Sequence, residues 1–373
     1  MPRLIALLYE ATVHGSQEAF CRGFATACRD QDWRMHLVGS ASKGGIEEAL
    51  RLEAAAIVGP LGRSDLACAA RDCGIPAVNV YGGAQLAGLP QVGISDRAIG
   101  TMAGRDLISR GYRHLAYIGF RHGTDREGVD KQRLAGLRHI ADEYGLSVQE
   151  STIRDRGLVD WLCSLPEPCG LVCVDDPIAA TIILAAERHA LSIPDRLALL
   201  GINNHHLLCE LSHPPLASIE LGAERLGSEA VDLVARQLDG RAIDTPVRML
   251  QPLRVHARGS IGISRGLPPV VRQALSLIDA DGWRHCDPER IARAVGRNRR
   301  VLDNAFRQHL GCTVFARLRE RLVIEIQLRL SSATGTSVTA IAEELGFSSP
   351  SYLNRLFRTV TGQTPVQWRR GAY

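Results

Sequence analysis

The sequence has no stretch of eighteen consecutive apolar residues, and the apolar run in its first ten residues, MPRLIALLYE, is only six residues long. A membrane-spanning helix needs about 20 such residues. A secretory signal needs a longer apolar region followed by a small-residue cleavage site. Because both patterns are missing, we expect a cytoplasmic protein with no membrane partner.

Metal-binding and catalytic signatures are also scarce. The ten cysteines contain no CxxC pair, and most of them lie among apolar residues, where a free cysteine behaves as a small buried side chain. The P-loop, GxGxxG and HExxH motifs are missing, and the one GxSxG match, Gly262–Gly266, lies in a predicted linker and not between a strand and a helix, as a catalytic serine of this type requires. We therefore expect reduced cysteines, no bound metal, no cofactor and no enzymatic activity.

Lysine is almost missing, since the chain has only Lys43 and Lys131, and arginine carries nearly all of the positive charge. This charge is unevenly distributed. Residues 265–373 contain 17 Arg against 9 Asp and Glu, a net charge of +8, whereas the whole chain has +4, which leaves −4 for residues 1–264. A basic C-terminal part on an acidic body indicates that only the C-terminal part binds a polyanion.

Short apolar runs alternate with amphipathic segments through the first 260 residues. The runs are nearly unbroken, as expected of strands that are buried on both faces. They are Leu4–Tyr9, Ala55–Gly59, Pro76–Val80, Leu115–Gly119, Gly170–Val174 and Leu197–Ile202. Alternation of strands with helices predicts parallel, doubly wound sheets. Six such units are many for one sheet, so we predict an α/β fold with two lobes, like that of periplasmic binding proteins.

The predicted boundaries follow from the same patterns. The first crossover between the lobes is placed near Gly111, after one helix, and a last extended segment crosses between the lobes once more. The α/β domain is predicted at 1–260, with lobe 1 at 1–110 and 222–240, and lobe 2 at 111–221 and 247–258. A linker at 261–269 precedes an all-α domain at 270–373, where no strand signal remains.

The all-α domain contains two similar helix-turn-helix patterns. In the second, EELGFSSPSYLNRLF, Gly346 occupies the position where a helix ends in the left-handed conformation, and Ser349 and Pro350 are typical of the start of the next helix. The first pattern has its turn at Gly296. An apolar-patterned helix, Val314–Leu330, joins the two patterns.

Polar side chains in the second helix of each pattern recur at i, i+4 and i+7. Their residue types contact base edges and phosphates in protein–DNA complexes. The alternative is a small helical bundle whose arginines are only solvated. Repetition of the pattern and the local net charge favour DNA binding. The candidate DNA-contacting residues are Arg299, Arg300, Asn304, Arg307, Ser351, Arg355 and Arg358.

The segment SVTAIAEELGFSSPSYLNRLFRTVTGQTPVQWR resembles the signature of AraC/XylS-type transcription regulators, and the resemblance covers roughly residues 270–370. In that family the outer faces of both recognition helices contact bases. The resemblance implies this role for Arg300, Asn304, Ser351 and Arg355.

Polar and aromatic residues follow several of the predicted strands. A doubly wound sheet binds ligands beyond the carboxyl ends of its strands, and carboxylates, amides and aromatic rings suit a neutral polyhydroxylated ligand. The residues at these positions are Tyr9, Glu10, Tyr81, Asp175 and Asn203.

Residues 3–258 also resemble the sugar-responsive core of LacI/GalR-type repressors. Matching segments are VGISDRAIGTMAGRDLISRGYRHLAYIG, KQRLAGL, LVCVDDPIAA and IPDRLALLGINN. The resemblance implies ligand contacts from Arg133, Asp175 and Asn203, with Asp96 and Glu10 as further candidates.

A LacI-like core followed by AraC-type helices is similar to activators of xylose operons. The resemblance implies a DNA-binding transcription regulator, expected to be an activator, with a small sugar such as the pentose D-xylose as effector. It also implies a homodimer that works with RNA polymerase at double-stranded operator DNA. Two other classes remain open: a sugar-binding protein and a carbohydrate-active enzyme with the same α/β core.

Overall fold

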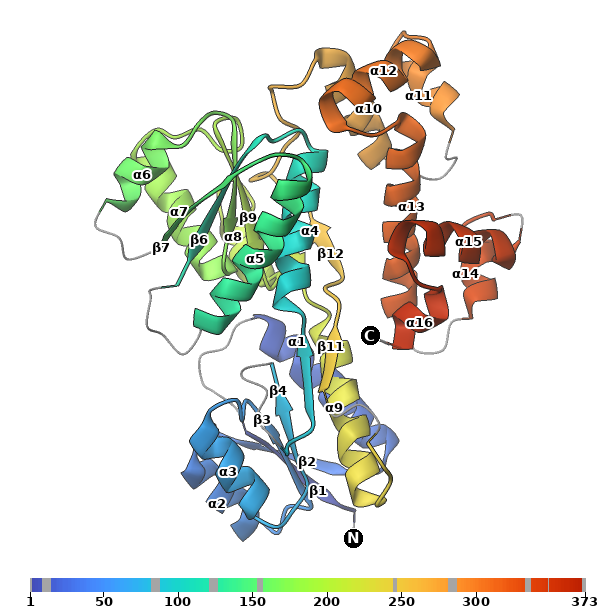
Figure 1. Ribbon diagram of the computed structural model, residues 1–373. Coiled ribbons are helices and arrows are strands. Elements are labelled where there is room, and N and C mark those ends of the chain that lie inside the picture. The colour runs from blue at the N-terminus through green and yellow to red at the C-terminus, as the bar shows by residue number, and fades with distance from the viewer. Residues whose placement is uncertain are drawn as a thin grey trace.

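The computed structural model describes residues 2–8, 15–81, 88–120, 127–152, 157–243, 247–280, 287–332, 337–347 and 349–370. Within them, two α/β lobes are followed by an all-helical part that lies along one side of the molecule (Figure 1). The predicted two-lobed α/β fold and helical C-terminal domain are thereby confirmed. None of the described helices is long and apolar enough to cross a membrane.

Lobe 1 contains a six-stranded parallel sheet with the strand order β11-β5-β4-β3-β1-β2. Its inner strands are buried, which explains why their segments read as unbroken apolar runs. The strands are β1 Leu4–Leu8, β2 Arg34–Val38, β3 Ala56–Gly59, β4 Ala77–Val80, β5 Gln91–Ile94 and β11 Val247–Leu250. The helices of this lobe are α1 Gly15–Asp30, α2 Lys43–Arg51, α3 Ser64–Asp72 and α9 Ala223–Leu238.

Lobe 2 contains a second six-stranded sheet with the order β12-β10-β9-β8-β6-β7, in which only β12 is antiparallel to its neighbour. The strands are β6 His114–Gly119, β7 Val148–Thr152, β8 Cys169–Cys173, β9 Leu197–Ile202, β10 Ala217–Glu220 and β12 Arg254–His256. The helices are α4 Asp96–Ser109, α5 Glu127–Glu143, α6 Leu158–Ser164, α7 Asp176–Arg188 and α8 His206–Leu211.

Two boundaries differ from the sequence-based prediction. The first crossover falls at Ser95 and not near Gly111, because α4 packs on α5 in lobe 2. Residues 247–250 belong to lobe 1, because β11 pairs with β5, whereas β12 pairs with β10 in lobe 2. The chain passes from β10 back to α9 at Leu221 and Gly222. The described chain therefore crosses between the lobes near Ser95, Leu221 and Leu253.

Glycine allows two helix pairs to approach closely. A Cβ atom at Gly100 of α4 would lie 1.8 Å from the carbonyl oxygen of Arg133 on α5. In lobe 1, a Cβ atom at Gly23 of α1 would lie 1.9 Å from the carbonyl oxygen of Glu224 on α9. Because any larger residue would collide with backbone, these contacts hold α5 against α4 in lobe 2 and the first turn of α9 against α1 in lobe 1.

The helical part consists of two units that share one long helix. The first unit has its own apolar core, built on Phe306, and the second has a separate core, built on Phe357. Helix α13 contributes Leu318 to the first core and Ile326 to the second. The helices are α10 Pro269–Ala280, α11 Pro288–Ala294, α12 Arg299–Leu310, α13 Val314–Ser332, α14 Val338–Glu344, α15 Pro350–Thr361 and α16 Pro365–Arg370.

The turn signals of the second unit lie where the sequence predicts them. Gly346 adopts the left-handed conformation, with a φ of 72°. The Ser349 hydroxyl accepts a hydrogen bond from the Tyr352 amide and caps α15, and Pro350 is its first residue. In the first unit, Gly296 and the Asn298 side chain play the same two parts before α12.

Candidate functional site: two helix-turn-helix faces and an interlobe cleft

The second helix of each unit, α12 or α15, presents a polar face to solvent. On α12, Leu302 and Phe306 face the core, and on α15, Leu353 and Phe357 do so. This burial leaves the polar side chains of both helices on the outside. All seven candidate DNA-contacting residues are exposed: Arg299, Arg300, Asn304, Arg307, Ser351, Arg355 and Arg358.

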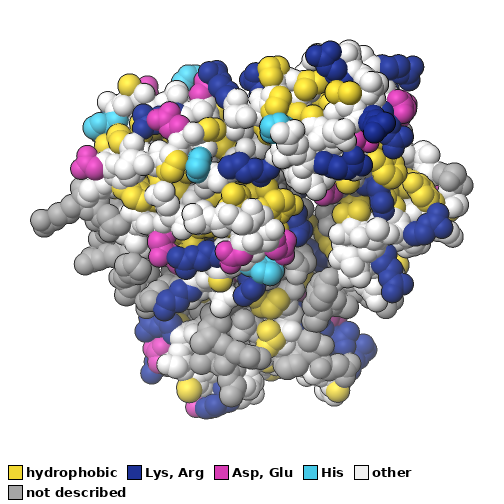
Figure 2. All heavy atoms as spheres, turned by 45° about the horizontal axis from the view of Figure 1, so that its top comes forward, with side chains coloured by type: hydrophobic (Ala, Val, Ile, Leu, Met, Phe, Trp, Pro, Cys, Tyr) yellow, Lys and Arg dark blue, Asp and Glu magenta, His cyan; other side chains and the backbone are white. Residues whose placement is uncertain are grey.

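Local contacts orient several of these side chains. The Arg307 guanidinium donates to the Asn304 side-chain oxygen at 3.3 Å, and the Arg355 guanidinium lies 5.5 Å from the centre of the Tyr352 ring. Arg299 lies 3.7 Å from Glu289 and 3.5 Å from Asp303 and is therefore directed towards the unit's own acidic groups. Figure 2 shows cationic side chains spread over the helical part, on the right of the view.

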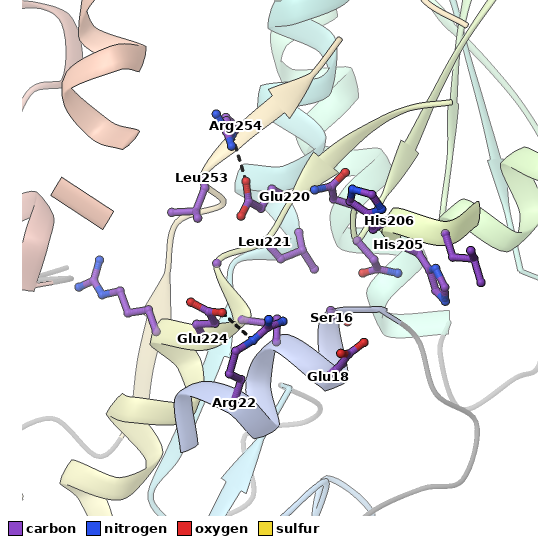
Figure 3. Close-up of a pocket in the computed structure, with 17 residues that line it drawn as sticks. Ser16, Glu18, Arg22, His205, His206, Glu220, Leu221, Glu224, Leu253 and Arg254 are labelled. Atoms are coloured by element: carbon purple, nitrogen blue, oxygen red, sulfur yellow. Dashed lines mark hydrogen bonds and ion pairs between the residues drawn. The ribbon is translucent and has the colours of Figure 1, made fainter. Parts of the chain in front are cut away.

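A cleft of about 760 Å³ lies between the lobes (Figure 3). Lobe 1 contributes the first two turns of α1, lobe 2 contributes the loop between β9 and α8, and the crossing segments close the cleft on one side. Its charged and polar lining residues are Ser16, Glu18, Arg22, Asn203, Asn204, His205, His206, Glu220, Glu224, Arg225 and Arg254. The guanidinium groups, carboxylates, amides and imidazole rings among them can donate hydrogen bonds to a small polar ligand and accept hydrogen bonds from it.

The crossing segments contribute a polar cluster to the cleft. The Glu220 carboxylate accepts a hydrogen bond from Arg254 at 3.0 Å and lies 2.6 Å from the His256 ring nitrogen. These hydrogen bonds, that of His256 first, lower the pKa of Glu220. The sequence does not reveal this cluster, because Glu220 lies more than thirty positions from Arg254 and His256 and meets them only when β10 pairs with β12.

The predicted ligand-binding residues fall into different places. Asn203 lines the cleft. Arg133 donates to Asp96 at 2.9 Å and to the Val174 carbonyl oxygen, so it joins α4, α5 and the end of β8. Burial raises the pKa of Asp96 despite this arginine partner. Asp175 is buried and caps α7 by accepting from the Ile178 amide at 2.9 Å.

Of the other predicted residues, Tyr81 is in lobe 1. Tyr81 follows the carboxyl end of β4, and the centre of its ring lies 5.3 Å from the centre of the Phe20 ring. Tyr9 and Glu10 lie outside the described residues. The cleft around Asn203 thus collects one predicted residue, while Asp96, Arg133 and Asp175 gather at neighbouring strand and helix ends of lobe 2.

Comparisons with known proteins match both parts of the chain. Residues 105–261 match a periplasmic binding protein-like domain, and residues 291–371 match a helix-turn-helix domain. The xylose operon regulatory protein of Escherichia coli (strain K12) is 27% identical over 311 residues, which cover 80% of this chain and 79% of that protein. The protein of the same name from Haemophilus influenzae is 24% identical over 289 residues, or 75% and 74% of the two chains.

A solved structure of a xylose-binding transcription activator, xylR, has the same fold, with a TM-score of 0.63 and 22% identity over 99% of this chain and 98% of that one. The chain joins a periplasmic binding protein-like domain to a helix-turn-helix domain. It is a DNA-binding transcription regulator, and the similar proteins reported above are named as regulators.

In the regulator, a buried carboxyl group holds the loop that carries Asn203. Asp176 accepts hydrogen bonds from the Ser218 hydroxyl at 2.5 Å and the His205 amide at 2.7 Å. Asn203 and Asn204 have φ values of 106° and 47°, and asparagine tolerates positive φ better than most residues. Burial raises the pKa of Asp176 to about 7.

The Asp176→Asn variant should flatten the pH dependence of stability. The folded state keeps a proton on Asp176 between the ordinary pKa of 3.8 and about 7, whereas the unfolded state has lost it, so the free energy of unfolding falls as pH rises through this window. A pKa difference of one is worth about 1.4 kcal/mol. Urea unfolding at several pH values between 4 and 8 measures the slope.

The neutral amide of the variant cannot titrate. Between pH 4 and 8, its free energy of unfolding should therefore fall less with rising pH than that of the wild-type chain. The exposed Asp142→Asn variant is the matched control and should keep the wild-type slope. Equal slopes for wild-type and Asp176→Asn would contradict the assignment of a buried, protonated carboxyl group.

Proposed function

We propose that the regulator is a transcription activator that binds double-stranded operator DNA with both helix-turn-helix units and responds to a small sugar, with D-xylose as the first candidate. The observation that carries the DNA-binding part is the pair of exposed polar faces on α12 and α15, held on one rigid helix, α13. A major groove admits one helix, and grooves on one DNA face recur about every 34 Å.

The proposed base and phosphate contacts come from the exposed residues of α12 and α15. Arg355 has its planar guanidinium beside Tyr352, in the middle of the outer face of α15, so we assign it to a base edge. Ser351 and Arg358 lie on the same face, as Arg300, Asn304 and Arg307 do on α12. Arg299 stays a proposed phosphate contact. Because it is paired with Glu289 and Asp303, we do not assign it to a base edge.

The proposed effector site is the cleft, extended by the strand ends of both lobes. Amide, carboxylate and guanidinium groups in the cleft form hydrogen bonds of the kind that sugar hydroxyl groups need. The similarity to xylose operon regulatory proteins over four-fifths of the chain supports D-xylose. Asn203 is the central candidate, and Tyr9, Glu10, Tyr81, Asp96, Arg133 and Asp175 remain proposed contacts or supports around it.

The proposed mechanism is a shift between arrangements of the two lobes. A sugar that touches both walls of the cleft has a higher affinity for the closed arrangement and therefore increases its population. In the family-based proposal, the regulator acts in the cytoplasm as a homodimer, and the sugar-bound form recruits RNA polymerase at the operator.

Arg355→Ala should relax sequence discrimination. Loss of a guanidinium that contacts a base edge costs about 1–3 kcal/mol at one base position. Competition binding with single-base operator variants, selected from a random DNA pool by the wild-type chain, measures this loss. Arg138→Ala, which removes an exposed arginine from α5 in the sensor, is the matched control and should leave discrimination intact. An Arg355→Ala chain that discriminates like the wild type would rule out base reading by this residue.

D-Xylose should raise the melting temperature of the wild-type chain, because a ligand that binds the native state at a hundred times its Kd adds about 2.7 kcal/mol of stability. Asn203→Gly should weaken this effect: glycine keeps the positive φ but removes the amide, whose hydrogen bonds are worth about 1–3 kcal/mol. Asn304→Gly, on the DNA-facing helix, should retain the D-xylose shift.

A panel of pentoses, hexoses and polyols completes the thermal-shift experiment. A shift with another sugar alone would replace D-xylose as effector. No shift with any sugar would contradict the sugar-binding part of the proposal, and an undiminished shift in Asn203→Gly would contradict the assignment of the cleft.

A further inference from the structure

The helical part contacts the sensor at two separate places. The first contact is on lobe 2. Arg113, between α4 and β6, donates to the carbonyl oxygen of His309 near the end of α12. Arg110 lies 3.8 Å from Asp279 of α10, and its carbonyl oxygen accepts from the Ser264 amide at 2.8 Å. The first helix-turn-helix unit is therefore attached to lobe 2.

Apolar packing strengthens this first contact. Gly111 has a φ of 93°, and a Cβ atom there would lie 2.4 Å from the Leu267 side chain, so the leucine fits directly against the glycine. Leu267 belongs to the apolar core of the first unit. The linker is thus packed between lobe 2 and the helical part and does not act as a loose tether.

The second contact is on lobe 1 and its crossing segment. Arg225, in the first turn of α9, donates to the carbonyl oxygens of Trp368, at 3.4 Å, and of Arg369. Leu253, in the segment between β11 and β12, packs against the apolar core of the second unit. The close contact of Gly23 with Glu224 holds this first turn of α9 on lobe 1. The second unit is therefore attached to lobe 1.

These two contacts are joined by α13, which belongs to both cores. Its 19 residues span roughly 28 Å at 1.5 Å per residue. A continuous helix with packed cores at both ends does not stretch or bend over a few ångströms without breaking contacts. The helical part is consequently a rigid body attached to lobe 2 at one end and to lobe 1 at the other.

We infer that the helical domain is a rigid bridge between the lobes, so that a change in lobe arrangement must break the contact on lobe 2, which includes Arg113, or the contact on lobe 1, which includes Arg225. The bridge is defined by α10–α16 and these two arginines. Arg225 also lines the cleft, so the second contact begins at the wall that a ligand would touch. The structure of the bridge does not depend on which effector binds. Its role in transmitting effector binding from the cleft to the DNA-binding helices rests on the proposed function.

The bridge predicts how lobe motion responds to the loss of each contact. The helical domain restrains lobe motion only while it is attached to both lobes. Loss of either contact therefore removes the restraint, and loss of the second contact does not increase lobe motion further. Two contacts that act independently would instead give additive effects. Spin labels on Cys68 of α3 and Cys163 of α6, the exposed cysteines of the described residues, report the distance between lobe 1 and lobe 2.

The experiment uses the full chain with Cys286 replaced by serine, and mass spectrometry confirms the labelled positions. Pulsed electron spin resonance should give a broader interlobe distance distribution for Arg113→Ala and for Arg225→Ala than for the wild type. The double variant should be no broader than either single variant. Arg225→Gln, a milder change, should give an intermediate width if Arg225→Ala folds poorly.

Arg236→Ala is the matched control, because Arg236 lies on the same helix and pairs with Asp232 of that helix, away from the helical domain. It should keep the wild-type distribution. Unchanged widths in both single variants, or widths that add in the double variant, would overturn the bridge.

A second arm connects the bridge to the effector. Arg113 is not part of the cleft lining, so Arg113→Ala should bind D-xylose at least as tightly as the wild type, because lobe motion no longer breaks this contact, but it should lose most of the D-xylose-dependent change in operator affinity. An unaltered response in Arg113→Ala would overturn the use of the bridge as a signal. If the wild-type chain itself does not respond to D-xylose, the proposed effector fails, while the distance measurement still decides the bridge.

Discussion

The three crossings between the lobes, near Ser95, Leu221 and Leu253, are the constraint on which the other features of the molecule depend. Each lobe is built on a sheet whose inner strands are buried on both faces and packed closely, so the lobes move as units, and relative motion is concentrated where the chain passes between them. The cleft is bounded by two of these crossings. Its polar cluster, Glu220 with Arg254 and His256, joins β10 and β12, the paired strands at the lobe 2 ends of these two crossings. A ligand in the cleft is therefore in contact with the part of the sensor that must move.

The helical domain meets the same region from the other side. Leu253 packs into the second helix-turn-helix core, and Arg225 connects the cleft wall to the end of α16. The proposed DNA-contacting side chains, by contrast, are exposed and take no part in the contacts named above. This separation allows the sensor to change the placement of α12 and α15 without covering them, which suits control by orientation better than control by occlusion.

Local signals explain what the sequence could predict. Unbroken apolar runs indicate strands buried on both faces, and Gly346 followed by Ser349 and Pro350 indicates the turn of a helix-turn-helix unit; the structure has each of these features. The crossover at Ser95 could not be predicted in this way, because it depends on the contact of Gly100 with the α5 backbone. The candidate site also divides into a predictable and an unpredictable part. Asn203 could be recognised because it follows a predicted strand. The Glu220 cluster and the arginines at both ends of the bridge could not, because they acquire their partners only through tertiary structure.

The central claim is that occupancy of the cleft controls DNA reading by the helical domain. Fluorescence anisotropy of a labelled operator, titrated with the full chain in the presence and absence of saturating D-xylose at one salt concentration, tests it most directly. Coupling between two sites in one protein is typically about 1–3 kcal/mol, so the account predicts a change in operator Kd of about 5–150-fold. Identical operator affinities with and without a sugar that demonstrably binds the cleft would contradict it.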